Sequence, residues 1–151
     1  MFLSTFGAMM GFAAEMAGRR EELYRAMAEQ AQDPVLKDLF QVLAGEEGKN
    51  RVLMVRARRE NVTEMILEPV AGLRPEAYEV DIEVSQLTED VSLLKAALMI
   101  EEREKRFFQD ASSKVPLPEV ARIFRKAALK KEENLRRLQG LGLSQTLKQR
   151  T

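Results

Sequence analysis

Glu47-Gly48-Lys49-Asn50 and Lys131-Glu132-Glu133-Asn134 occupy equivalent positions in two copies of one sequence unit, and this repeat decides the fold. A shift of 84 residues aligns the two halves of the chain without a gap. Six of the seven pairs that support the alignment are identities: Ala13 with Ala97, Arg19 with Arg103, Tyr24 with Phe108, Pro34 with Pro118, Phe40 with Phe124, Ala44 with Ala128 and Asn50 with Asn134. These pairs combine helix-starting prolines with core-type side chains. We therefore interpret each half as one helix–turn–helix unit.

The spacing of apolar residues and the turn signals place two helices in each unit. The four expected helices span about residues 4–31, 34–59, 88–113 and 118–139. Asp33-Pro34 is typical of a helix cap followed by a first helical residue, and Val115-Pro116-Leu117-Pro118 forms the corresponding second turn. Gly140 and Gly142 are expected to end the last helix. Residues 144–151 would then form a flexible C-terminal tail.

Residues 60–87 form a long connection between the two units, broken by Pro69, Gly72 and Pro75. The alternation from Val80 to Val84 leaves a short extended piece possible. This connection is long enough to run the length of the bundle, so the second and third helices are expected to be parallel. One long crossover is the ferritin-like pattern. The predicted fold class is all-α: a ferritin-like four-helix bundle of two repeated hairpins joined by one crossover, in a single domain over residues 1–143.

Composition excludes several function classes. The 151 residues include 24 acidic and 24 basic side chains but no cysteine and no histidine. The balanced charge argues against a nucleic-acid partner, which requires a basic excess. Without cysteine or histidine there is no disulfide, no thiolate and no imidazole base or ligand. The apolar stretch Met1–Ala14 lacks a basic flank and is too short to span a bilayer, so a cytoplasmic location without membrane partners is expected.

Several motifs resemble the di-iron domain of the rubrerythrin family, over about residues 8–139. They are Glu-Leu-Tyr at 22–24, Gln-Asp-Pro at 32–34, Leu-x-x-Leu-Phe at 36–40, Leu-Ala-x-Glu-Glu at 43–47 and the helix sequence at 97–108. In that family each repeat supplies one Glu from its first helix and a Glu-x-x-His from its second. The resemblance implies that these side chains bind two irons at the bundle centre.

Most of the implied ligands are missing from this chain. Transferred position by position, the six ligand positions hold Ala17, Glu47, Asn50, Glu101, Lys131 and Asn134. Glu104 matches a further carboxylate of the family. Only Glu47 and Glu101 therefore keep the expected residue type among the six.

We interpret the change as replacement of the metals by side-chain cations. Lys131 is expected to pair with Glu47 and Glu101, and Arg20, the repeat equivalent of Glu104, is expected to pair with Glu104. Asn50 and Asn134 would complete the hydrogen bonds, since an amide both donates and accepts. The alternative is that these charged side chains are ordinary surface residues.

Three function hypotheses follow. The first is a non-catalytic scaffold or interaction protein without a cofactor. The second is a metal-binding oxidoreductase or metal-storage protein that holds Fe or Mn with carboxylates alone, because such ligands favour hard cations; its ligands would be Glu47, Glu101 and Glu104, with Glu15 in reach. The third is a small-molecule binder that uses a cavity between the helices.

The chain is also expected to form a homodimer. Phe2, Leu3 and Phe6 make the start of the first helix unusually apolar. We expect this segment to pack on a second copy, with burial in its own bundle as the alternative.

Overall fold

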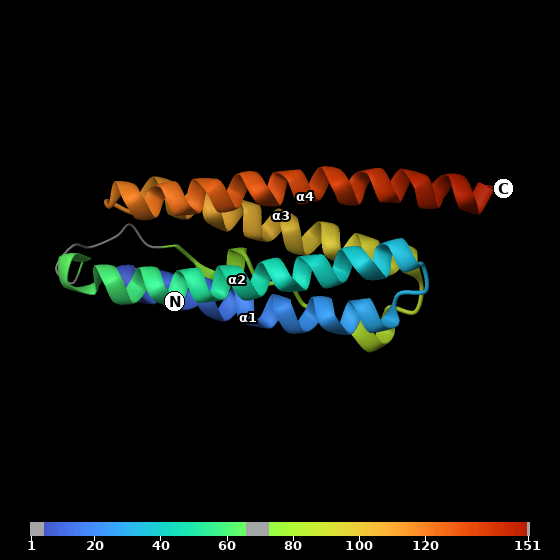
Figure 1. Ribbon diagram of the computed structural model, residues 1–151, viewed down its shortest axis with the longest axis horizontal. Coiled ribbons are helices and arrows are strands. Elements are labelled where there is room, and N and C mark those ends of the chain that lie inside the picture. Colours follow the sequence, from blue (N-terminus) through green and yellow to red (C-terminus); the bar gives the residue numbers. More distant parts are fainter. Residues whose placement is uncertain (1–4, 66–72, 151) are drawn as a thin grey trace.

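The computed structural model describes residues 5–65 and 73–150, with residues 62–65 and 143–150 described as backbone only. The elements are helices α1 (Phe6–Gln30), α2 (Pro34–Met65), α3 (Asp90–Lys114) and α4 (Pro118–Arg150), with 3-10 turns η1 (Pro75–Ala77) and η2 (Val84–Gln86). Helices α1 and α2 form one antiparallel hairpin and α3 and α4 the other (Figure 1). The predicted all-α bundle of two hairpins is confirmed.

Side-chain caps start the helices of the first hairpin. The Thr5 hydroxyl accepts a hydrogen bond from the backbone N–H of Ala8, which satisfies one of the free donors of α1. The Asp33 carboxylate does the same for the N–H of Val35 at the start of α2. The turn between these helices is held from the other hairpin, because the Asp90 carboxylate accepts from the N–H groups of Gln32 and Asp33.

The crossover runs back along the bundle, so α2 and α3 point in the same direction, as predicted (Figure 1). Its described part is tied to two helices. The Gln30 amide of α1 donates to the carbonyls of Val84 and Leu87, and Arg103 of α3 donates to the carbonyl of Glu79. The alternating segment does not form a strand within the described residues, and Val84 begins η2 instead.

Two of the predicted helix ends are wrong. Helix α2 continues to Met65 rather than ending near residue 59, and α4 continues to Arg150 rather than ending near residue 139. Neither Gly140 nor Gly142 has a positive φ. Each glycine costs the helix about 1 kcal/mol relative to Ala, but Leu141 packs on the apolar core next to them. The tertiary contact outweighs the weak local signal, and residues 144–150 are helical.

Two apolar clusters fill the bundle, one toward each end. The first centres on aromatic rings, with Phe107 in edge contact with Phe12 and Phe124. The second is mostly aliphatic and includes Leu36, Leu43, Leu93, Ile100 and Leu138. Between them lies a layer of buried charged side chains. The core is therefore apolar, then charged, then apolar along the bundle axis.

The start of α1 differs from the expectation in one respect. Phe6 is 2% exposed and belongs to the aromatic cluster of its own chain, so it does not offer apolar surface to a second copy. Phe2 and Leu3 lie outside the described residues. A homodimer remains a prediction.

Over the described residues, none of the helices has a stretch long and apolar enough to cross a bilayer.

Candidate functional site

The Lys131 ammonium lies at the centre of the charged layer. Its Nζ is 2.9 Å from Glu47 Oε1, 3.0 Å from Glu101 Oε2 and 3.5 Å from Glu104 Oε1. All four side chains are almost fully buried. They come from α2, α3 and α4, so one cation joins the first hairpin to both helices of the second.

Glu101 is the best-satisfied acid of the cluster. Its Oε2 accepts from Lys131 and, at 2.8 Å, from the Tyr24 hydroxyl. Its Oε1 accepts from Asn134 Nδ2, also at 2.8 Å. Glu101 thus receives hydrogen bonds from α1 and from two positions of α4, which makes it the principal acceptor of the cluster.

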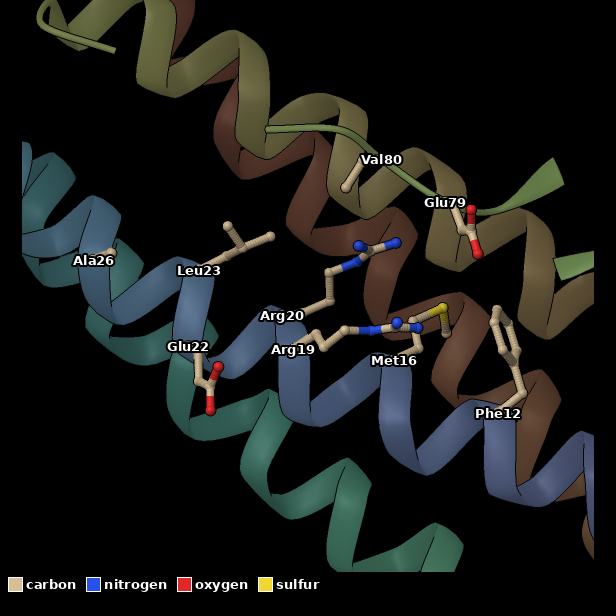
Figure 2. Close-up of a pocket in the computed structure, with 9 residues that line it drawn as sticks. All are labelled: Phe12, Met16, Arg19, Arg20, Glu22, Leu23, Ala26, Glu79 and Val80. Atoms are coloured by element: carbon tan, nitrogen blue, oxygen red, sulfur yellow. The ribbon is translucent and has the colours of Figure 1, made fainter. Parts of the chain in front are cut away.

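Arg20 connects the cluster to the crossover. Its Nε is 3.8 Å from Glu104 Oε1, beyond hydrogen-bond distance, and its Nη2 donates to the Tyr78 carbonyl at 2.9 Å. A pocket of about 500 Å³ lies between α1 and the crossover. Arg20 lines it together with the exposed Arg19 and Glu79 (Figure 2). Arg20 therefore separates the buried cluster from a surface pocket.

Within the described residues, five buried polar atoms lack a hydrogen-bond partner: Arg20 Nε, Glu47 Oε2, both oxygens of Glu104 and Asn134 Oδ1. Three of them belong to the facing carboxyl groups of Glu47 and Glu104. Burial and the charges of Glu47 and Glu101 raise the pKa of Glu104 well above its usual value, and Lys131 only partly opposes them. A proton on Glu104 would give Glu47 a donor. The two remaining carboxylates would then balance Lys131 and Arg20.

Lys131 is held in its charged form. Burial by itself would lower the pKa of Lys131, but the charges of Glu101, Glu104 and Glu47 outweigh it and raise this pKa well above its ordinary value. Burial and the same three acids also raise the pKa of the Tyr24 phenol, which keeps it a neutral hydrogen-bond donor. Both shifts move the pKa further above neutrality, so neither Lys131 nor Tyr24 has the pKa near pH 7 that suits a general base.

The two asparagines of the repeat behave differently. Asn134 is buried and donates to Glu101 and to Glu46 Oε2. Asn50 is only half-buried and lines a surface pocket between α2 and α4. No hydrogen bond joins Asn50 to the cluster within the described residues, so the expectation that both amides complete the network is wrong for Asn50.

Two other positions considered as metal ligands, Ala17 and Glu15, offer no donor atom to the buried cluster. Ala17 is buried in α1 and presents only a methyl group. Glu15 is exposed and lines a different surface pocket with Glu21 and Glu22. Among the residues that the structure describes, no group of three or more Asp, Glu, His or Cys side chains is arranged to hold a metal ion.

Sequence reasoning missed three participants. Glu46 accepts a hydrogen bond from Asn134, and its Oε1 lies 3.6 Å from Lys130 Nζ. The Tyr78 carbonyl accepts from Arg20, and the Tyr78 hydroxyl donates to Asp110. The repeat alignment identified Tyr24 only as a core-type side chain and gave it no hydrogen bond. A signal was available for Tyr24, because its repeat mate is Phe108 and the hydroxyl is what distinguishes the two side chains.

Comparison with known proteins gives one family. The model of the family described as Rubrerythrin matches residues 9–134. A solved structure titled as a hypothetical protein from Pyrococcus furiosus superposes with a TM-score of 0.69 at 21% identity, covering 91% of this chain and 88% of that one. At that identity the likeness concerns the fold alone. No curated protein matches the chain.

We predict that Glu101→Ala destabilises the protein by roughly 3–5 kcal/mol, because it leaves a buried ammonium with one fewer charge partner. The free energy of unfolding from urea melts measures the effect. The control is Glu102→Ala, the next residue on α3, which is exposed and should change stability by less than about 0.5 kcal/mol. A change of that small size in Glu101→Ala would mean that the carboxylate is solvated.

Glu104→Gln should alter how stability depends on pH. A carboxyl group with a raised pKa binds more protons folded than unfolded, so its contribution is complete below the unfolded pKa of about 4.3 and is lost as pH rises toward the folded pKa. The neutral amide removes this loss. We expect melts between about pH 5 and pH 8 to show a flatter profile for the variant, which is at least as stable as wild type at the upper end.

Glu101→Gln is the matched control, since it makes the same change one turn earlier on α3. It should destabilise the protein throughout this range because Glu101 accepts three hydrogen bonds. Equal effects of the two amide variants would contradict the assignment of the proton to Glu104.

Proposed function

The chain belongs to the rubrerythrin family, and from this premise we propose that it is a member in which the Lys131 ammonium has replaced the di-iron centre. The protein then acts as a non-catalytic scaffold or interaction protein. Its contribution is a stable four-helix surface rather than oxygen or peroxide chemistry.

One observation supports the proposal above the others. The Nζ of Lys131 lies within 3.5 Å of three buried carboxylates, Glu47, Glu101 and Glu104, which stand at positions where the family resemblance implies metal ligation. A cation bound to its own chain supplies the positive charge that these carboxylates require. It needs no metal from solution.

The residues present do not fit two irons. Ala17 has no donor atom, and Asn134 uses its N–H group to donate to Glu101 rather than presenting a lone pair. Lys131 stands where the resemblance implies a carboxylate, and its positive charge repels a metal ion at that point. Since the chain has no histidine and no cysteine, softer ligands are absent as well.

A competing candidate rests on the unpartnered oxygens. Glu47 Oε2 and both oxygens of Glu104 have no hydrogen-bond donor among the described residues, and carboxylate oxygens bind hard cations. A carboxylate-only site for Fe or Mn on Glu47, Glu101 and Glu104 would make the protein a metal-storage protein or an altered oxidoreductase. A measurement of metal content separates the two candidates.

We expect near-zero iron and manganese per chain after expression in supplemented medium and purification without a chelator, measured by elemental analysis. Adding Fe(II) or Mn(II) should leave the melting temperature unchanged, because a ligand stabilises a protein only if it binds the folded state. One tightly held metal per chain, lost in both Glu47→Gln and Glu101→Gln, would overturn the proposal in favour of the carboxylate site.

Lys131→Met gives the complementary measurement. Methionine keeps much of the length of lysine but removes the charge, so the three carboxylates lose their central cation and the protein should lose roughly 3–5 kcal/mol of stability. Mn(II) should then raise the melting temperature of this variant and not that of wild type. If Mn(II) raises the melting temperature of both proteins equally, the ammonium does not occupy the metal position.

A further inference from the structure

The outward face of α2 carries a second regular pattern, separate from the one that faces the core. Six of its residues are spaced alternately by three and four positions, which is the a/d spacing of a coiled-coil seam. They are Val35, Asp38, Val42, Gly45, Lys49 and Val52, and all six are exposed. We refer to these six residues as the α2 seam.

The seam gathers exposed apolar side chains on one helix face. Val35, Val42 and Val52 are 58%, 46% and 54% exposed, which makes them three of the six large hydrophobic side chains exposed among the described residues. A helix at the edge of a bundle normally has a single apolar stripe. A second stripe on the opposite side indicates a contact with another helix.

The seam is complementary to itself in one orientation. When two copies of α2 run antiparallel about a two-fold axis, Val35 faces the partner's Val52, Asp38 faces the partner's Lys49, and Val42 faces the partner's Gly45. Each of these pairings occurs twice because of the symmetry. A parallel arrangement would instead place Asp38 against the partner's Asp38 and Lys49 against the partner's Lys49, which is repulsive.

Gly45 allows the two helices to approach closely. A Cβ built at Gly45 would meet no atom of its own chain within 4 Å. The glycine therefore serves no packing contact inside the bundle, although it costs the helix about 1 kcal/mol relative to Ala. Opposite the partner's Val42, a residue without a side chain provides the depression into which a valine side chain packs.

We propose that the α2 seam is a homodimer interface, in which α2 packs antiparallel on the α2 helix of a second copy and Asp38 pairs with the partner's Lys49. The two Asp38–Lys49 pairs, together with two valine–valine and two valine–glycine layers, favour a second copy over an unrelated protein. The seam replaces the start of α1 as the dimer surface, and it does not depend on whether the central site holds a metal.

The size of the seam sets the expected affinity. It spans residues 35–52, about 27 Å at 1.5 Å per residue, and small valine-lined interfaces of this kind are weaker than obligate ones. We expect a dimer with a Kd roughly in the micromolar range. Sedimentation equilibrium of the full chain from about 1 to 200 µM measures this Kd.

Charge reversal tests the register. Asp38→Lys or Lys49→Asp alone places like charges opposite each other twice, and each should raise the Kd at least about tenfold. The double variant Asp38→Lys/Lys49→Asp restores opposite charges and should recover the wild-type Kd. The control is Glu102→Lys on the exposed face of α3, which should leave the Kd unchanged. All these positions are exposed, so helical content should be unaffected.

Cysteine pairs test the same register covalently, because the native chain has no cysteine. A mixture of Val42→Cys and Gly45→Cys chains should form a disulfide-linked dimer on oxidation, and either variant alone should form much less. A mixture of Val35→Cys and Gly45→Cys is the mismatched control.

A chain that stays monomeric up to the highest concentration would overturn the proposal. So would a dimer whose Kd is unchanged by Asp38→Lys, since dimerisation would then use another surface. Failure of the double variant to recover the wild-type Kd would overturn the antiparallel register. Because metal content is not part of either measurement, these results are independent of those that test the proposed function.

Discussion

The interaction on which the structure depends is the contact of one ammonium with three buried carboxyl groups. Lys131 of α4 reaches Glu47 of α2 and both Glu101 and Glu104 of α3, while Tyr24 of α1 donates to Glu101. All four helices therefore meet at one point. Burying these charges is costly, and a buried ion pair is often no more stabilising than apolar residues of the same volume. The cluster is better understood as a device that specifies one arrangement of the two hairpins, since any other arrangement leaves a charge unpaired.

The position of the cluster along the axis supports this interpretation. Aromatic packing around Phe107 lies on one side and aliphatic packing around Leu43 on the other. If one hairpin slid along the other by a turn, Lys131 would enter an apolar cluster and the carboxylates would face each other without a cation. The penalty for an unpaired buried charge is several kcal/mol, so the charged layer fixes the register that apolar contacts alone would leave less well defined.

The sequence predicted features that are local or repeated, and missed those that depend on tertiary packing. The Asp33-Pro34 start of α2 and the Pro118 start of α4 follow from cap chemistry. The approach of Lys131 to Glu47 follows from the repeat, because equivalent positions of the two hairpins face each other across the bundle. The two asparagines show the limit of this symmetry: a single ammonium comes from one repeat only, so Asn134 lies beside it and Asn50 does not. The path of the crossover to Arg20 and the extension of α4 past its glycines were not predictable, because non-local contacts decide both.

Helix α2 links the core to the surface. Its inner face carries Glu47, which binds the central ammonium, and its outer face carries the exposed valines around Gly45. The two faces place different demands on one helix. The inner face holds the Glu47 charge in register with Lys131, while the proposed dimer requires the outer face to stay regular over eighteen residues. Lys131 is part of the chain itself, so the cation that binds Glu47 is present in every molecule. If the seam dimerises as proposed, association stabilises the folded state by mass action. The apparent stability of the charged core would then depend on protein concentration, which connects the two faces of α2 thermodynamically although they share no side-chain contact.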